Sequence, residues 1–159
     1  LAAGKNRRLN ATKRLLDEWA LAYARLLRPR TKTVTYDTPH FDAWKDWHID
    51  PDQARWGGEP AAHLLVRHLK PGVLTLYAET LPPRLMIEQR LVPAGLLGLP
   101  RYLEVRKPFW GKALLTDAPA NTVPPVLVYA DLLATGDGRC IETARMIYDG
   151  HLARLFPAA

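Results

Sequence analysis

The sequence predicts an α+β fold: a small mixed β-sheet flanked by helices. Three observations favour this class: short segments of alternating or β-branched residues, longer segments with apolar residues at helical spacing, and the interleaving of the two along the chain. A distant relation to the restriction-endonuclease fold is left open. With 159 residues, 48% of them hydrophobic, the chain can bury one core, so we expect residues 1–159 to form a single domain.

The first predicted elements are a helix and a strand. Apolar residues recur at helical spacing up to about Leu27, and Asn10 or Thr12 can cap the start of this helix. The helix should end before Pro29, because the residue preceding a proline is disfavoured in the helical conformation. Residues 32–36 alternate in polarity and include β-branched threonines, which is typical of a strand.

The middle of the chain is expected to alternate between turns, helices and strands. The turn-rich stretch 37–58 contains three tryptophans, so we expect it to fold back on the core. Residues 59–69 and, more briefly, 82–91 have the spacing of helices. The ranges 73–79 and 102–107 are the clearest strands, since apolar side chains alternate along them.

The last third of the chain predicts two helices with a tight break between them. Pro125 suits a first helical position, Gly136 a left-handed stop, and Asp137 the cap of the second helix. Asp131 is left over from the apolar pattern and is interpreted as an ion-pair partner. The single cysteine, Cys140, is expected to be a packed thiol on an apolar helix face.

Positive charge is concentrated at the amino-terminal end. Residues 1–32 hold nine basic and two acidic side chains, a net +7, whereas residues 33–159 hold 13 basic and 14 acidic side chains, a net −1. Such a concentration is typical of a surface that contacts phosphates, although a solvated helix face would have the same composition. The candidate nucleic-acid phosphate contacts are Lys5, Arg7, Arg8, Lys13 and Arg14.

No complete catalytic motif occurs. The sequence lacks a phosphate-binding P-loop, a dinucleotide-binding glycine motif, the HExxH zinc motif and a nucleophile elbow. We therefore expect no catalytic residue, no bound metal and no cofactor. The strongest metal candidates are a run of loop residues, which we interpret as a solvated acidic loop: His40, Asp42, Asp46, His48, Asp50 and Asp52.

Membrane insertion and secretion are not indicated. No apolar run approaches the ~20 residues that a membrane-spanning helix needs, and the first residues lack the apolar core of a signal peptide. A lone cysteine cannot form an internal disulfide and is compatible with a reducing compartment. We expect a cytoplasmic protein.

One enzymatic alternative is a metal-dependent nuclease of the PD-(D/E)xK type. In such enzymes acids on neighbouring strands hold Mg²⁺, and a lysine two residues after the second acid helps to orient the attacking water. Glu79 and Glu104 are the candidate acids here, but Arg106 occupies the lysine position and Lys107 falls on the other face of the strand. A degenerate, inactive relative is therefore favoured over an active nuclease.

Three stretches together resemble a known family. They are LLDEWALAYARLLRPRT at 15–31, WGGEPAAHLLVRHLKPGVLTLYAE at 56–79 and VLVYADLLATGDGRCIETARMIYDGHL at 126–152. They are similar to the AbiEi antitoxins of bacterial type IV, abortive-infection toxin–antitoxin systems, in their carboxy-terminal domain. These are structural rather than catalytic motifs, and they cover most of the chain.

The resemblance implies a non-enzymatic antitoxin and transcriptional regulator. In such proteins an amino-terminal winged helix binds operator DNA, and the following domain opposes a nucleotidyltransferase-like toxin without a stable complex between the two. Because the sequence begins with Leu1 rather than Met, we expect such a winged helix to precede it. The remaining alternative is a DNA-binding module that acts through the basic amino-terminal arm.

Overall fold

The computed structural model describes residues 10–111, 119 and 121–158, and is built around a mixed β-sheet. Its five strands lie in the order β2-β3-β5-β1-β4. Strands β3 and β5 are parallel, and the other neighbouring pairs are antiparallel. The strands are β1 (Lys32–Asp37), β2 (Arg55–Gly57), β3 (Val73–Tyr77), β4 (Val92–Pro93) and β5 (Tyr102–Arg106).

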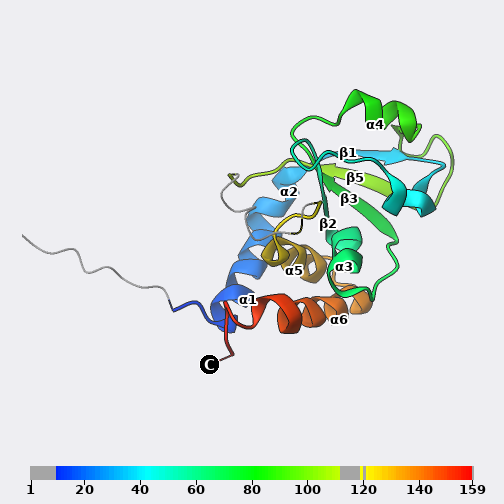
Figure 1. The fold of residues 1–159 in the computed structure, drawn as a ribbon. Coiled ribbons are helices and arrows are strands. Elements are labelled where there is room, and N and C mark those ends of the chain that lie inside the picture. Colours follow the sequence, from blue (N-terminus) through cyan, green and yellow to red (C-terminus); the bar gives the residue numbers. More distant parts are fainter. Residues whose placement is uncertain (1–9, 112–118, 120, 159) are drawn as a thin grey trace, which may run out of the picture.

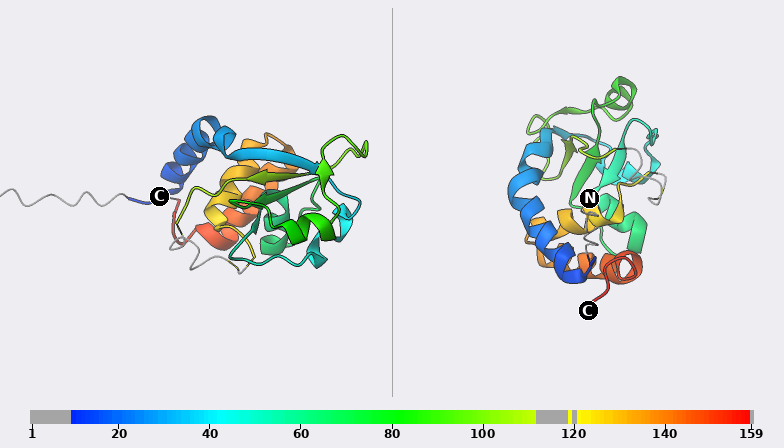
Figure 2. Two further views of the ribbon diagram at one scale, coloured as in Figure 1. Left: turned by 90° about the horizontal axis from the view of Figure 1, so that it is seen from above. Right: turned by 90° about the vertical axis from the view of Figure 1, so that its left-hand side faces the viewer.

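Most helices lie on one side of this sheet. Figure 1 shows α3 and α5 beneath the strands, α6 below them, and α4 on the opposite side of the sheet. The right-hand view in Figure 2 shows the same arrangement, with α4 at the top and α6 toward the bottom. The helices are α1 (Lys13–Ala22), α2 (Arg28–Thr31), α3 (Gly58–Val66), α4 (Pro83–Glu88), α5 (Pro125–Ala134) and α6 (Gly138–Ile147). The α+β class is thereby confirmed, and every helix in the described part of the chain is too short or too polar to cross a bilayer.

Apolar burial holds the layers together. Leu74, Leu76 and Leu103 on the central strands are fully buried, as is Leu132 on α5. The tryptophans of the 37–58 stretch are buried against the same core, which confirms that this stretch folds back. Part of the stretch forms the 3₁₀-helix Phe41–Asp46, and its end forms β2, a short strand that the sequence pattern did not predict.

The first helix passes through Pro29, so the prediction that it ends there was wrong. Between α1 and α2 the chain forms a π-helical turn, Tyr23–Leu27, and the N–H of Arg28 donates to the carbonyl of Tyr23. A proline inside a regular helix removes one backbone donor and crowds the carbonyl four residues earlier. The wider π-helical turn lies immediately before Pro29 and changes this hydrogen-bond spacing, so the helical path continues to Thr31.

The two carboxy-terminal helices agree with their sequence signals. Pro125 is the first residue of α5, Gly136 has φ +69°, and the Asp137 carboxylate accepts from the N–H of Arg139 as the cap of α6. Cys140 is buried, as expected. A second π-helical turn, Tyr148–Leu152, follows α6.

Candidate functional site

The two central strands present polar side chains to the helices. Successive side chains along a strand point to opposite faces, and the parallel register places Thr75 opposite Glu104 and Tyr77 opposite Arg106. All four side chains are buried. Leu74, Leu76 and Leu103 occupy the alternating positions on the other face. The interface between the sheet and the helices α2 and α5 is therefore polar where an apolar one would be usual.

Glu104 and Arg106 pair with each other along one face of β5. Arg106 Nε donates to Glu104 Oε1 at 3.1 Å, and Nη2 donates to Oε2 at 3.2 Å. Arg106 Nη1 also donates to the carbonyl oxygen of Arg28 and to Thr31 Oγ1, each at 2.9 Å, which joins the sheet to α2. Burial disfavours the charged guanidinium, but the Glu104 carboxylate outweighs this effect and raises the pKa of Arg106.

Asp131 on α5 is the centre of a second buried group. Its Oδ1 accepts from the hydroxyl of Tyr23 at 2.5 Å and from Arg28 Nε at 3.1 Å, and its Oδ2 accepts from the hydroxyl of Tyr77 at 2.6 Å. Burial raises the pKa of the Asp131 carboxyl, although both tyrosines and Arg28 favour its ionised form. Burial and this carboxylate likewise raise the pKa of both tyrosines.

Both groups border one cavity, which we call the charged cavity. It has a volume of about 660 Å³ and lies among α2, α3, β3, β5, α5 and the start of α6. Its ionisable lining residues are Arg28, Lys32, Glu59, Glu104, Arg106, Asp131, Asp137 and Cys140, with Tyr102 at one wall. A concentration of buried ionisable groups around a cavity is typical of functional sites, although structural networks produce it too.

Every carboxylate oxygen of Glu104 and Asp131 accepts at least one hydrogen bond from the protein itself. Besides the two Arg106 nitrogens, Thr75 Oγ1 donates to Glu104, at 2.9 Å from Oε1. No buried side-chain nitrogen or oxygen in the described residues lacks a partner. As arranged here, the two carboxylates orient arginines and tyrosines and hold strands to helices. That is an architectural task.

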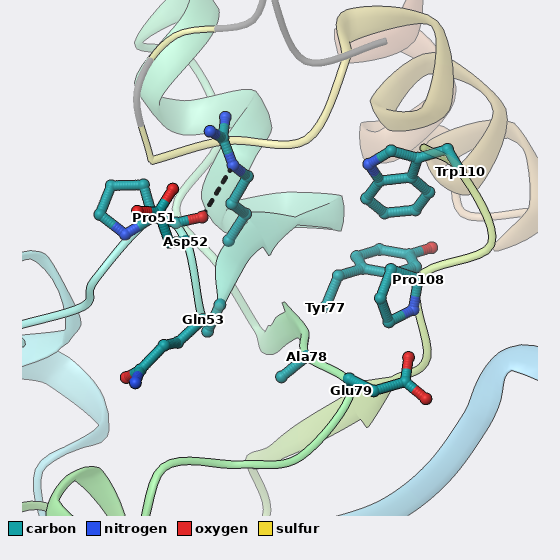
Figure 3. Close-up of a pocket in the computed structure, with 10 residues that line it drawn as sticks. Pro51, Asp52, Gln53, Tyr77, Ala78, Glu79, Pro108 and Trp110 are labelled. Atoms are coloured by element: carbon teal, nitrogen blue, oxygen red, sulfur yellow. Dashed lines mark hydrogen bonds between the residues drawn. The ribbon is translucent and has the colours of Figure 1, made fainter. Parts of the chain in front are cut away.

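The two candidate nuclease acids do not converge. Glu104 is buried at the charged cavity, whereas Glu79 is exposed beyond the end of β3 and lines a separate cavity of about 360 Å³. Figure 3 shows the Glu79 carboxylate beside Pro108, below Tyr77 and Trp110. Arg55 also lines that cavity. Thr75 is level with Glu104, whereas Glu79 lies four residues further along the chain, beyond the end of β3 at Tyr77.

The histidines and aspartates of the 37–58 stretch are dispersed. His40 Nδ1 lies 3.2 Å from the side-chain oxygen of Gln89, and Asp42 is held by Arg101 in a two-pronged pair of 2.6 and 3.1 Å. Asp50 accepts from the N–H of Asp52. Across residues 10–111, 119 and 121–158, no three His, Cys, Asp or Glu side chains are grouped so that they could hold a metal ion.

The predicted phosphate contacts are only partly within the described residues. Lys5, Arg7 and Arg8 lie outside them. Lys13 and Arg14 are on the first turn of α1, where Lys13 Nζ pairs with Asp17 at 2.8 Å and Arg14 Nε pairs with Glu18 at 3.2 Å. Their role as phosphate contacts stays a prediction.

Sequence reasoning did not assemble the group around Asp131. Asp131 was expected to form an ion pair, and it does so with Arg28. The periodicity of the helix that contains Tyr23 and of the strand that contains Tyr77 did not predict their hydrogen bonds to Asp131. The available signal was the pattern Thr75, Tyr77, Glu104, Arg106: polar residues at alternate positions on two strands whose remaining residues are apolar. Finding their partners on the helices required the three-dimensional arrangement.

A comparison with protein families gives a match over residues 8–153. The matching model describes a transcriptional regulator, the AbiEi antitoxin of type IV toxin–antitoxin systems. No curated protein and no solved structure matches the chain. The match spans the sheet, the charged cavity and α6.

Proposed function

The chain belongs to the AbiEi antitoxin family of type IV toxin–antitoxin systems, a family of transcriptional regulators, and on this premise we propose that it acts as a non-enzymatic antitoxin domain. Its opponent in this proposal is a nucleotidyltransferase-like toxin, which it counteracts in the cytoplasm without a stable complex. Operator DNA is bound by the full-length protein through a winged helix. Basic residues of the amino-terminal arm add phosphate contacts beside it.

One observation supports the non-enzymatic part of this proposal above all others. The buried acids best placed for chemistry, Glu104 and Asp131, have all their oxygens engaged by arginine, tyrosine and threonine donors of the same chain. At the position where a nuclease would carry lysine, Arg106 forms the two-pronged pair with Glu104. A metal-dependent reaction would need these oxygens to turn away from their donors toward an ion.

Co-expression tests the antitoxin function. The full-length protein, expressed with the toxin encoded by the adjacent gene, is expected to relieve the growth arrest that the toxin alone causes. Glu79→Gln, at an exposed carboxylate outside the charged cavity, should protect as well as the wild type. Growth arrest that persists at normal levels of soluble antitoxin would count against the proposal.

A nuclease assay tests the enzymatic alternative. Purified protein is incubated with plasmid DNA and Mg²⁺ or Mn²⁺, and no cleavage is expected. Cleavage that Glu104→Ala abolishes would overturn the non-enzymatic proposal. Because Glu104→Ala removes a buried charge and can unfold the protein, Glu79→Gln serves as the second variant. Loss of cleavage in a folded Glu79→Gln protein would implicate the same pair of acids.

The alternative of a DNA-binding module that uses the basic arm has a separate test. Replacing Lys5, Arg7 and Arg8 with glutamine should weaken operator binding and flatten its dependence on salt, because each phosphate contact releases counterions. Lys45→Gln is the control, since this exposed lysine lies on the 3₁₀-helix and outside the arm. Binding unchanged by the triple substitution would remove the arm from the proposed DNA contacts.

A further inference from the structure

Two cations stand at the edge of the charged cavity. Arg28 lies on α2 and Lys32 is the first residue of β1, directly after that helix, and both line the cavity. Lys32 is exposed and forms no ion pair with any carboxylate of the described residues. Arg28 uses only Nε in its pair with Asp131. Its two terminal nitrogens make no hydrogen bond to the part of the chain that the structure describes.

Hydrogen bonds fix both the side chain and the backbone carbonyl of Arg28. Its Nε donates to Asp131 Oδ1, and the hydroxyls of Tyr23 and Tyr77 fix that carboxylate in turn. Its backbone carbonyl accepts from Arg106 Nη1 at 2.9 Å and from the Thr31 hydroxyl at 2.7 Å. The planar fork of a guanidinium matches a phosphoryl group, and an arginine oriented in advance loses less entropy when it binds one.

Each acid that lines the cavity pairs with an arginine of the described residues. Glu104 pairs with Arg106, and Asp131 pairs with Arg28. Glu59 and Asp137 both pair with Arg139, at 3.3 and 3.5 Å. Each of the four carboxylates that line the cavity therefore has a cationic partner. Because Arg139 serves two of these carboxylates, the four acids balance Arg28, Arg106, Arg139 and Lys32 in total charge. Lys32 is the cation at the cavity that has no carboxylate partner among the described residues.

The size and remaining lining of the cavity indicate a small polar ligand. Its volume of about 660 Å³ lies within the range of roughly 300–1,000 Å³ that small-molecule sites occupy. The hydroxyls of Thr75 and Thr135, the carboxylate groups and the Tyr102 ring line it, so it offers acceptors for hydroxyl groups behind the cationic edge. A duplex could touch the edge but not enter the cavity.

We propose that the charged cavity binds a small phosphomonoester, with the phosphoryl group on Arg28 and Lys32 and the hydroxyl-bearing part inside the cavity. The ligand is either a sugar phosphate or a nucleoside monophosphate, which share this chemistry. The proposal does not depend on the antitoxin function. A ligand held here would contact α2 and β1 together, next to the Asp131 group.

Isothermal titration of the full chain at low salt tests the proposal, with inorganic phosphate, ribose 5-phosphate and a nucleoside 5′-monophosphate as probes. At least one of the two organic phosphates should bind more tightly than inorganic phosphate. Lys32→Gln should weaken that binding about tenfold or more, the typical effect of losing one charge-assisted contact. Lys32→Arg should restore most of the affinity. The relative affinities of the two organic probes identify which source supplies the ligand.

Lys107→Gln is the matched control. Lys107 follows Arg106, is exposed and does not line the cavity, so binding should be unchanged. Failure of all three probes to bind the wild type would overturn the proposal. So would unchanged binding by Lys32→Gln, or an equal loss in Lys107→Gln. Dependence on Lys32 that appears only with a short DNA duplex would also overturn it, whereas the co-expression experiment would still judge the antitoxin function.

Discussion

The two faces of the central strands are both buried, but different interactions hold them against their neighbours. On one face Leu74, Leu76 and Leu103 lose their exposure to water completely. On the other, Tyr77, Glu104 and Arg106 are also buried, with 2–6% of their surface exposed, and each buried polar side-chain atom has a hydrogen-bond partner. Apolar burial stabilises the fold in proportion to the buried area, so a small change in side-chain size changes the stability by a small amount. A buried ion pair contributes little net stability, yet the loss of one partner leaves a charge without compensation.

The difference teaches where this fold is fragile. The apolar face resembles that of many α+β domains, and its residues could be exchanged for others of similar volume. The polar face joins β3 and β5 to α2 and α5 through specific donors and acceptors, so it fixes how these elements are placed relative to one another. The charged cavity lies against this face. We therefore expect the polar contacts to hold the candidate site in one conformation.

The largest effect should follow from breaking the buried pair. Glu104→Ala leaves the Arg106 guanidinium buried beside Thr31 without its carboxylate, and we expect a loss of about 3–5 kcal/mol in the free energy of unfolding. Urea denaturation at neutral pH measures it. Glu18→Ala removes the glutamate of an exposed Arg–Glu pair on α1 and should cost much less.

A double substitution sharpens the same prediction. Glu104→Leu together with Arg106→Met replaces the pair with apolar side chains, and it should be less destabilising than Glu104→Ala alone. The reason is that no charge is then left without a partner. A double variant that is less stable than either single variant would mean that the pair contributes large net stability, contrary to the comparison drawn above.

Truncating a side chain on the apolar face should lower the free energy of unfolding by a somewhat smaller amount. Leu76→Ala removes three buried carbon atoms from the core and should cost roughly 2–4 kcal/mol, depending on how far the surroundings collapse. Val34→Ala, on the exposed part of β1, is the control and should change stability by about 0.5 kcal/mol or less. Equal losses at both positions would show that burial does not govern this face.

The polar face should also make stability depend on pH through Asp131. Burial raises the pKa of this carboxyl in the folded state above its unfolded value of about 3.9. The folded protein thus keeps a proton that the unfolded chain has already lost, so this contribution is complete below the unfolded pKa and fades as pH rises through the folded pKa.

Comparison with Asp131→Asn isolates this contribution. The difference in unfolding free energy between the wild type and Asp131→Asn should shrink as pH rises from about 4 to about 7, by ~1.4 kcal/mol for each unit by which the pKa is raised. Denaturation of both proteins across this range measures it. A difference that grows with pH would mean that the hydrogen bonds from Tyr23 and Tyr77 and the Arg28 charge outweigh burial.

The sequence predicted the apolar face and its elements better than the polar one. Helical and strand periodicity placed β3, β5, α5 and α6 within a few residues, because apolar alternation reports directly on burial. Glycine and proline rules identified Gly136 and Pro125 correctly but failed at Pro29, where a π-helical turn lies in the helix immediately before the proline. Local rules contain no information on such a turn.

The candidate site could be predicted only in its components. Glu104 and Arg106 are two residues apart on one strand, so their shared face follows from the sequence alone. Tyr77 and Tyr23, whose hydroxyls donate to Asp131, precede it in the sequence by 54 and 108 positions. No periodicity connects residues at such separations. The same limitation applies to the approach of Lys32 to the cavity.

The smallest predicted effect distinguishes a hydrogen-bonded tyrosine from a merely packed one. Tyr23→Phe keeps the ring, which stacks on Trp19 at a centroid distance of 5.3 Å, and removes only the hydroxyl that donates to Asp131. Because Arg28 still donates to the same oxygen, we expect a modest loss of about 1–2 kcal/mol, measured by urea denaturation. Tyr148→Phe is a suitable control, since the Tyr148 hydroxyl donates to the carbonyl of Phe156, away from the charged cavity.

Tyr23→Phe should also loosen Arg28 and weaken phosphomonoester binding, whereas Tyr148→Phe should affect stability alone. Equal effects of both variants on binding would separate the Asp131 group from the cavity and leave the polar face with a purely structural role.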